Sequence, residues 1–246
     1  MRSTILALLF VFQGSIHLMA QSTPLAIVEA FFAPEGMSNK HDLYTGEMQS
    51  FVNERTMGQY LGPSVSKDIR LLSSSDSTAT YAIAVKSGGR IQDWYAFLRR
   101  SEGRWRLQAV RTLAETGLVA ATLKGLRAMP SRTTEQDWQL RNAELTLSSD
   151  ADLKTFLQSN LPAFEALVSV VRKGTREAVA IAAKKLFLSS ANTAPAGYVE
   201  LTIGGILDNT VGYLYVPDGV TLPSVTPNEV IYLERIVDHW YVYKTT

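Results

Sequence analysis

The 246-residue chain contains no cysteine and only three histidines, and it has almost no excess of charge of either sign. Without cysteine it can form neither disulfide bonds nor the lipid-modified cysteine of a lipoprotein. Zinc hydrolases need histidine or cysteine ligands at fixed spacings, and no His-Glu-x-x-His pattern occurs here. The 24 basic residues face 23 acidic ones, so the basic excess of a nucleic-acid binder is missing. We therefore expect no metal, no cofactor and no nucleic-acid partner.

Long apolar runs are also absent. A membrane-spanning helix needs roughly 20 apolar residues, and no stretch of the sequence reaches that length. The most apolar stretch, residues 5–12, follows the single basic residue Arg2 and is followed by polar residues and then the small Ala20. This order is typical of a cleavable secretory signal peptide over residues 1–20, although Leu18 is an imperfect residue for the cleavage site. A buried N-terminal strand is the alternative. We expect an exported protein, periplasmic or extracellular, without a retained membrane anchor.

Residues 21–113 and 114–246 each read as helices followed by strands. In the first unit we expect helices at 24–33 and 43–61 and strands at 69–73, 78–87, 90–100 and 104–113. In the second we expect helices beginning at 115, 133, 149, 161 and 175, a loop at 189–197 and four strands at 198–207, 211–216, 229–237 and 240–245. Because short turns join only antiparallel neighbours, the fold class is α+β, with two helix-then-antiparallel-sheet units.

The first unit resembles the cone-shaped α+β superfamily typified by nuclear transport factor two and ketosteroid isomerase. The resemblance depends on the leading helix that ends in Ala30-Phe31-Phe32, a second helix, an antiparallel sheet and a closing Gly-x-Trp-x-Leu strand at 103–107. It implies a cone-like curved sheet backed by helices around an apolar pocket. That superfamily contains both enzymes and binding proteins, so the resemblance does not select a function. The second half resembles no family that we recognise.

Carboxylates in an apolar pocket could catalyse acid-base chemistry, with tyrosine or histidine donors opposite them. Asp93 is the first candidate because it alternates with Tyr95 and Phe97 on one face of its strand. The alternative is that this face points outward and that Trp94, Ala96 and Leu98 form the buried face. The second candidate group is the three neighbouring residues His41, Asp42 and Tyr44.

Several arginines crowd one predicted hairpin beside a tryptophan, and guanidinium groups suit carboxylate and phosphate ligands. The candidate ligand-binding residues are Arg99, Arg104, Trp105 and Arg106. The alternative is a solvated outer face that discourages aggregation between sheets.

Three functions therefore stay open. The first is an exported soluble binding or accessory protein of the bacterial cell envelope, which would recognise an unknown small molecule or an envelope protein. The second is a small-molecule isomerase or dehydratase that uses Asp93 or Asp42. The third is a structural, oligomeric envelope protein. The lack of any catalytic motif favours the first.

Overall fold

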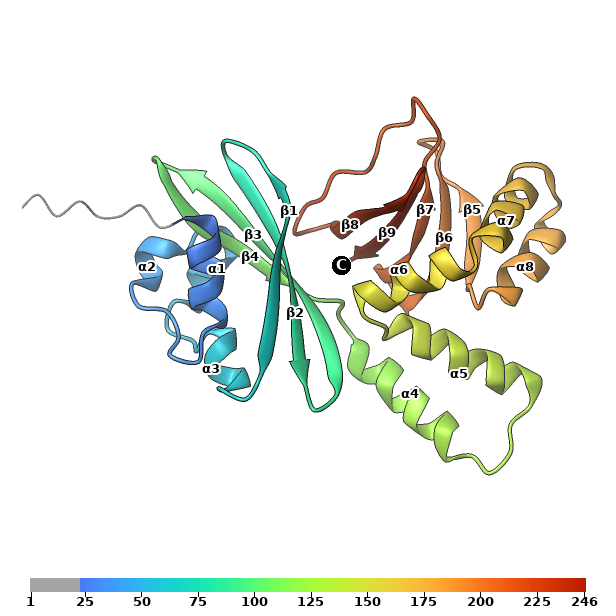
Figure 1. Cartoon of the computed structure of the whole chain (residues 1–246), viewed down its shortest axis with the longest axis horizontal. Helices are drawn as coiled ribbons and strands as arrows, with labels where there is room; N and C mark the ends of the chain where they lie inside the picture. Colours follow the sequence, from blue (N-terminus) through green and yellow to red (C-terminus); the bar gives the residue numbers. More distant parts are fainter. Residues whose placement is uncertain (1–22) are drawn as a thin grey trace, which may run out of the picture.

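A computed structural model describes residues 23–246 of the chain, which form two antiparallel sheets flanked by helices (Figure 1). The α+β class expected from the sequence is confirmed. The expected signal peptide, residues 1–20, lies outside the described residues. None of the helices within residues 23–246 is long and apolar enough to cross a bilayer.

The first unit opens with helix α1 (Pro24–Phe32), whose N-terminus is capped by the hydroxyl of Thr23. Three short helices follow: α2 (Lys40–Leu43), the 3-10 helix η1 (Gly46–Phe51) and α3 (Met57–Leu61). The single helix expected over 43–61 is therefore wrong. Gly46 has a left-handed backbone, with φ at 56°, and the side chain of Gln59 accepts a hydrogen bond from the Thr56 amide to begin a new helix.

The first sheet is an antiparallel meander of four strands: β1 (Ser66–Ser74), β2 (Thr78–Ser87), β3 (Arg90–Ser101) and β4 (Arg104–Arg111). Gly88 and Gly89 make the two-residue turn between β2 and β3, both with positive φ. One face of the sheet packs against α1 through a buried cluster that includes Phe32, Ile83 and Leu98.

Five helices follow the first sheet: α4 (Thr116–Ala128), α5 (Thr134–Thr146), α6 (Asp150–Ser159), α7 (Leu161–Lys173) and α8 (Arg176–Lys185). The hydroxyls of Thr133, Ser149 and Thr175 cap α5, α6 and α8, so these expected helix starts are confirmed. Figure 1 shows α4 and α5 as a hairpin that projects from the rest of the protein.

The second sheet contains five strands: β5 (Ser190–Thr193), β6 (Val199–Ile206), β7 (Asn209–Tyr215), β8 (Val230–Val237) and β9 (Trp240–Thr245). The expected count of four strands is wrong, because β5 lies in the segment 189–197 that we expected to be a loop. Its polar residues give no alternating pattern, and it pairs only along one edge of β6. The order β5-β6-β7-β9-β8 also departs from a meander, since β9 lies between β7 and β8.

One of the hydrophobic clusters contains residues of both units. The face of the first sheet that is turned away from α1 contributes Ala82, Tyr95 and Phe97 to a cluster that also contains Tyr213 and Tyr232 of the second sheet. Both faces of β3 are therefore buried. Trp94 and Ala96 belong to the α1 side, and Tyr95 and Phe97 to the side of the second unit.

Gly58 shows how closely α1 and α3 approach each other. A Cβ atom at Gly58 would lie 2.1 Å from the carbonyl oxygen of Ala33, so no side chain fits without moving the backbone. We expect Gly58→Ala to lower the free energy of unfolding by about 1–3 kcal/mol in urea denaturation. The control is Gly117→Ala in α4, where a Cβ meets open space and a gain of about 0.5–1 kcal/mol is expected. Equal midpoints for the two variants would contradict this packing.

Candidate functional site

Three charged side chains meet in the interior where the two units join. The Nζ atom of Lys244 in β9 lies 2.8 Å from Oδ1 of Asp150 and 3.3 Å from Oδ2 of Asp93. These side chains are only 5%, 8% and 6% exposed, respectively. We call Asp93, Asp150 and Lys244 the buried charge cluster. It links the first sheet, the start of α6 and the last strand of the protein.

Further donors complete the hydrogen bonding of the cluster. The backbone amide of Asp150 donates to Oδ2 of Asp93 at 2.8 Å, so the Asp93 carboxylate lies at the N-terminus of α6, where the helix dipole stabilises an anion. The hydroxyl of Tyr95 donates to Asp150 at 2.8 Å. The ring of Tyr95 stacks on that of Tyr232 with 4.9 Å between centroids, and the Lys244 ammonium lies within 6 Å of both rings.

The local sequence explains how these groups meet. Asp93 and Tyr95 alternate on the face of β3 that is turned toward the second unit. Asp150 is the first residue of α6, directly after its capping residue Ser149. Lys244 follows Trp240 and Val242 on the side of β9 that faces the cluster shared with the first sheet. Strand alternation and helix capping thus set the directions of the three side chains, and the packing of the two units brings them into contact.

Burial and charge act against each other in the cluster. Burial raises the pKa of Asp93, and although the Lys244 cation acts to lower it, the pKa stays above its usual value. For Lys244, burial acts to lower the pKa, but the attraction of Asp150 and Asp93 outweighs burial and raises it. Lys244 is therefore held as a cation, which cannot act as a nucleophile. Within residues 23–246, no group of three or more carboxylate or histidine side chains is placed to hold a metal ion.

A second ionic group joins the same units nearer the surface. Glu234 of β8 accepts a two-pronged hydrogen bond from Arg70 of β1, at 2.7 and 2.9 Å, and one from Lys154 of α6 at 3.1 Å. The Tyr232 hydroxyl also donates to Glu234, at 2.5 Å. This bidentate geometry fixes the edge of the first sheet against the second unit.

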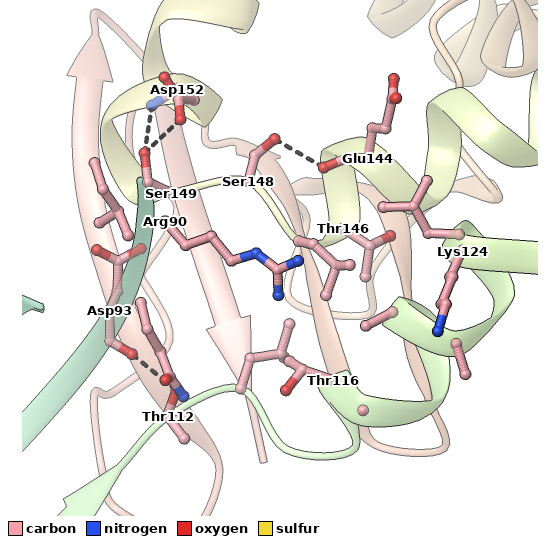
Figure 2. A pocket seen from close by; sticks show the side chains of 18 of the residues that line it. Arg90, Asp93, Thr112, Thr116, Lys124, Glu144, Thr146, Ser148, Ser149 and Asp152 are labelled. Atoms are coloured by element: carbon pink, nitrogen blue, oxygen red, sulfur yellow. Dashed lines mark hydrogen bonds between the residues drawn. The ribbon is translucent and has the colours of Figure 1, made fainter. Parts of the chain in front are cut away.

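A cleft of about 1020 Å³ opens above the buried charge cluster, with Asp93 and Lys244 among its lining residues (Figure 2). The turn between β2 and β3 and the start of β3 supply one wall, with Arg90 and Ile91. Helix α4 supplies another, and the rest comes from the end of α5, the start of α6, Thr112 and Leu113 after β4, and Lys244. The α4 wall consists of Thr116, Gly117, Ala120, Ala121, Leu123, Lys124 and Arg127.

The charged groups of the cleft differ in whether they are paired. Glu144 accepts hydrogen bonds from Arg127 and Arg141, each at 2.8 Å. Partial burial acts to raise the pKa of Glu144, but these two arginines outweigh it and the pKa lies below its usual value. By contrast, Arg90 and Lys124 have no ion pair or hydrogen bond to any side chain in residues 23–246. Figure 2 shows the Arg90 guanidinium pointing into the middle of the cleft.

The structure places the expected catalytic candidates in two separate regions. Asp93 is buried at the cleft. His41 and Asp42 lie in α2, on the other side of the first sheet, where both are exposed (Figure 1). Tyr44 is fully buried there beside Leu107, and burial raises its pKa to about 12.

The expected arginine site lies at the end of the β3–β4 hairpin, and none of its four residues lines the cleft. Arg99 and Arg104 are exposed. Arg106 donates to Glu102 at 3.0 Å and to the carbonyl oxygen of Asp42, so internal contacts use its donors. Trp105 packs against the α1 cluster.

Sequence reasoning missed Asp150, Lys244, Arg90 and Lys124. One signal was present for Lys244, since alternation in its strand puts it on the same side as Trp240 and Val242. Asp150 gave no signal beyond its place at the start of a helix. Arg90 is the first residue of the expected strand 90–100, and nothing else in the sequence distinguishes it.

Comparisons of the chain with protein-family models, with curated proteins and with solved structures found no match. Functional inference therefore depends on the cleft and the cluster themselves.

Removal of the buried cation tests the role of the cluster. Lys244→Met leaves two carboxylates without their countercharge, and we expect it to lower the free energy of unfolding by about 3–5 kcal/mol in urea denaturation. The control Lys86→Met, at an exposed strand position, is expected to stay within about 0.5 kcal/mol of wild type. Adding Asp150→Asn to Lys244→Met should recover part of the loss. Similar stabilities for the two lysine variants would show that the cluster contributes little.

The buried tyrosines and Lys244 predict loss of stability at high pH. Burial raises the pKa values of Tyr95, Tyr213 and Tyr232 above 10.0, and the paired carboxylates raise that of Lys244 above 10.5. Above these ordinary values the unfolded chain releases protons that the folded protein keeps. Each group's stabilising contribution is therefore complete below its ordinary pKa and is lost as the pH rises toward the folded-state pKa.

We expect the free energy of unfolding to fall as the pH rises above about 10, by about 1.4 kcal/mol per pH unit for each such group above its ordinary pKa. Tyr213→Phe should make this slope shallower by one group, whereas Tyr60→Phe, at a 61% exposed residue, should leave it unchanged. Urea denaturation at a series of pH values measures the slope. Constant stability over this range would contradict the assignment.

Proposed function

We propose that this chain is a non-catalytic binding protein exported to the bacterial cell envelope and that it holds a small molecule in the cleft between the β2–β3 turn and α4. The observation that carries the proposal is the pairing of the charged groups in this cleft. The acid and amine at its inner end, Asp93 and Lys244, are already bound to each other, whereas Arg90 and Lys124 on its walls have no ion pair within residues 23–246.

The packing of α4 supports a binding role. In α4, all of whose residues the structure describes, only Leu126 is buried. A helix with so few buried contacts opens and adjusts more easily than the core around it. The cleft also lies where two units join, which is a common place for a ligand site.

The alternative is an isomerase or dehydratase that uses Asp93, and the raised pKa of Asp93 favours it. Such an enzyme needs a carboxylate free to take a proton, with tyrosine or histidine donors opposite. However, Oδ2 of Asp93 already accepts hydrogen bonds from Lys244 and the Asp150 amide. Among the described residues that line the cleft, none is tyrosine or histidine. Binding is therefore the better-supported function, and the resemblance of residues 21–113 to the cone-shaped superfamily stays a prediction.

Two glycines of α4 offer a matched test. A Cβ atom at either Gly117 or Gly125 meets open space, but only Gly117 lines the cleft. We expect the neutral fluorescent probe N-phenyl-1-naphthylamine to bind the wild-type protein and Gly125→Phe with similar affinity. Gly117→Phe should weaken binding by about tenfold or more, because its ring occupies the cleft.

Fluorescence titration measures the three affinities, and circular dichroism confirms that both variants are folded. Equal binding to Gly117→Phe and Gly125→Phe would place the probe elsewhere and overturn the proposal. A failure of the wild-type protein to bind the probe would also count against an apolar small-molecule site in this cleft.

A further inference from the structure

We infer that the ligand of this cleft is an amphipathic acid, with a carboxylate or phosphate head bound by Arg90 and an apolar body along α4. The inference rests on the proposed function, since it specifies the chemical class of ligand for the same cleft.

The β-hairpin fixes the position of Arg90. Arg90 follows the Gly88-Gly89 turn and pairs with Ser87 across it, so its backbone belongs to the ladder of the first sheet. Its side chain extends from this end of the sheet into the cleft (Figure 2). A guanidinium group that no carboxylate of residues 23–246 pairs with can offer a planar fork of donors, which matches the oxygens of a carboxylate or phosphate.

The acidic groups that face the cleft are each held by other partners. Asp93 is bound by Lys244 and by the Asp150 amide, and Glu144 by two arginines. The side chain of Asp152 accepts a hydrogen bond from the Ser149 hydroxyl at 2.7 Å and lies in the first turn of α6, where the helix dipole stabilises its charge. Among the cleft residues that the structure describes, Arg90 and Lys124 on the opposite helix are therefore the cations without an ion pair, and the acid without one, Asp152, is occupied by the Ser149 hydroxyl and the start of α6.

Part of the remaining lining is apolar. Ile91 beside Arg90 is 38% exposed although it is a large aliphatic residue, and Leu113 and Leu123 also line the cleft. Ala120 and Ala121 of α4 add two small apolar side chains to the lining. A ligand with only a charged head would leave the exposed Ile91 in water, whereas an aliphatic or aromatic body would cover it.

Four ligands with eight carbon atoms each and different heads test the inference: octanoate, octyl phosphate, octanol and octylammonium. Isothermal titration calorimetry with the wild-type protein is expected to show at least one anion binding about tenfold or more tightly than octanol, and octylammonium binding most weakly. The relative affinity of the two anions indicates whether the natural head is a carboxylate or a phosphate.

Arg90→Gln should reduce the affinity for the preferred anion by about tenfold and leave that for octanol unchanged, because only the anion needs the guanidinium. Arg99→Gln is the matched control, since Arg99 is an exposed arginine of the same strand outside the cleft. Both changes remove the same charge from the protein, so a general electrostatic effect would appear in both variants.

Equal affinities for octanol and the two anions, or equal effects of the two arginine variants, would overturn the anionic head. The proposed binding function would still stand if octanol bound and Gly117→Phe abolished that binding. If neither the anions nor octanol bound, and the neutral fluorescent probe also failed, both proposals would be wrong.

Discussion

The structure depends most on the burial of Lys244 between Asp93 and Asp150. Removing three charged groups from water is costly, and the cost is offset only when the ion pairs and hydrogen bonds among them form together. The first sheet, the start of α6 and the last strand must therefore be in place at once. The cluster and the surrounding aromatic residues favour one arrangement of the two units over looser ones, in which a charge would be buried without a partner.

This constraint also explains the character of the cleft. The inner end of the cleft is polar because the buried charge cluster lies there. However, the carboxylate of Asp93 and the ammonium group of Lys244 are already paired with each other. In the part of the chain that the structure describes, the cations without an ion pair are instead on the walls: Arg90 on the β2–β3 hairpin and Lys124 on α4, a helix with one buried residue. Such a division suits recognition of a ligand better than proton transfer, since an acid-base catalyst needs an exchangeable proton at the point where the substrate binds.

Local patterns predicted much of the fold correctly, including the α+β class, the four strands of the first sheet and the capped starts of α5, α6 and α8. The predictions failed where the local pattern is weak or is compatible with more than one structure. The short polar strand β5 has no alternation, and the position of β9 between β7 and β8 depends on strand pairing across a long loop. Of the site, only Asp93 was anticipated. Its burial was uncertain because alternation along β3 defines two faces without showing which of them a second layer covers.

The sequence by itself determined the scarcity of metal-ligating side chains, the near-neutral charge, and the helices and strands whose caps and periodicity are local. Only the tertiary structure decided that both faces of β3 are buried, that Asp93 meets residues 57 and 151 positions further along the chain, and that Arg90 faces an open cleft. The physical reason is that capping and alternation involve neighbours within a few residues. A buried ion pair is defined by partners that only the packing of whole units brings together.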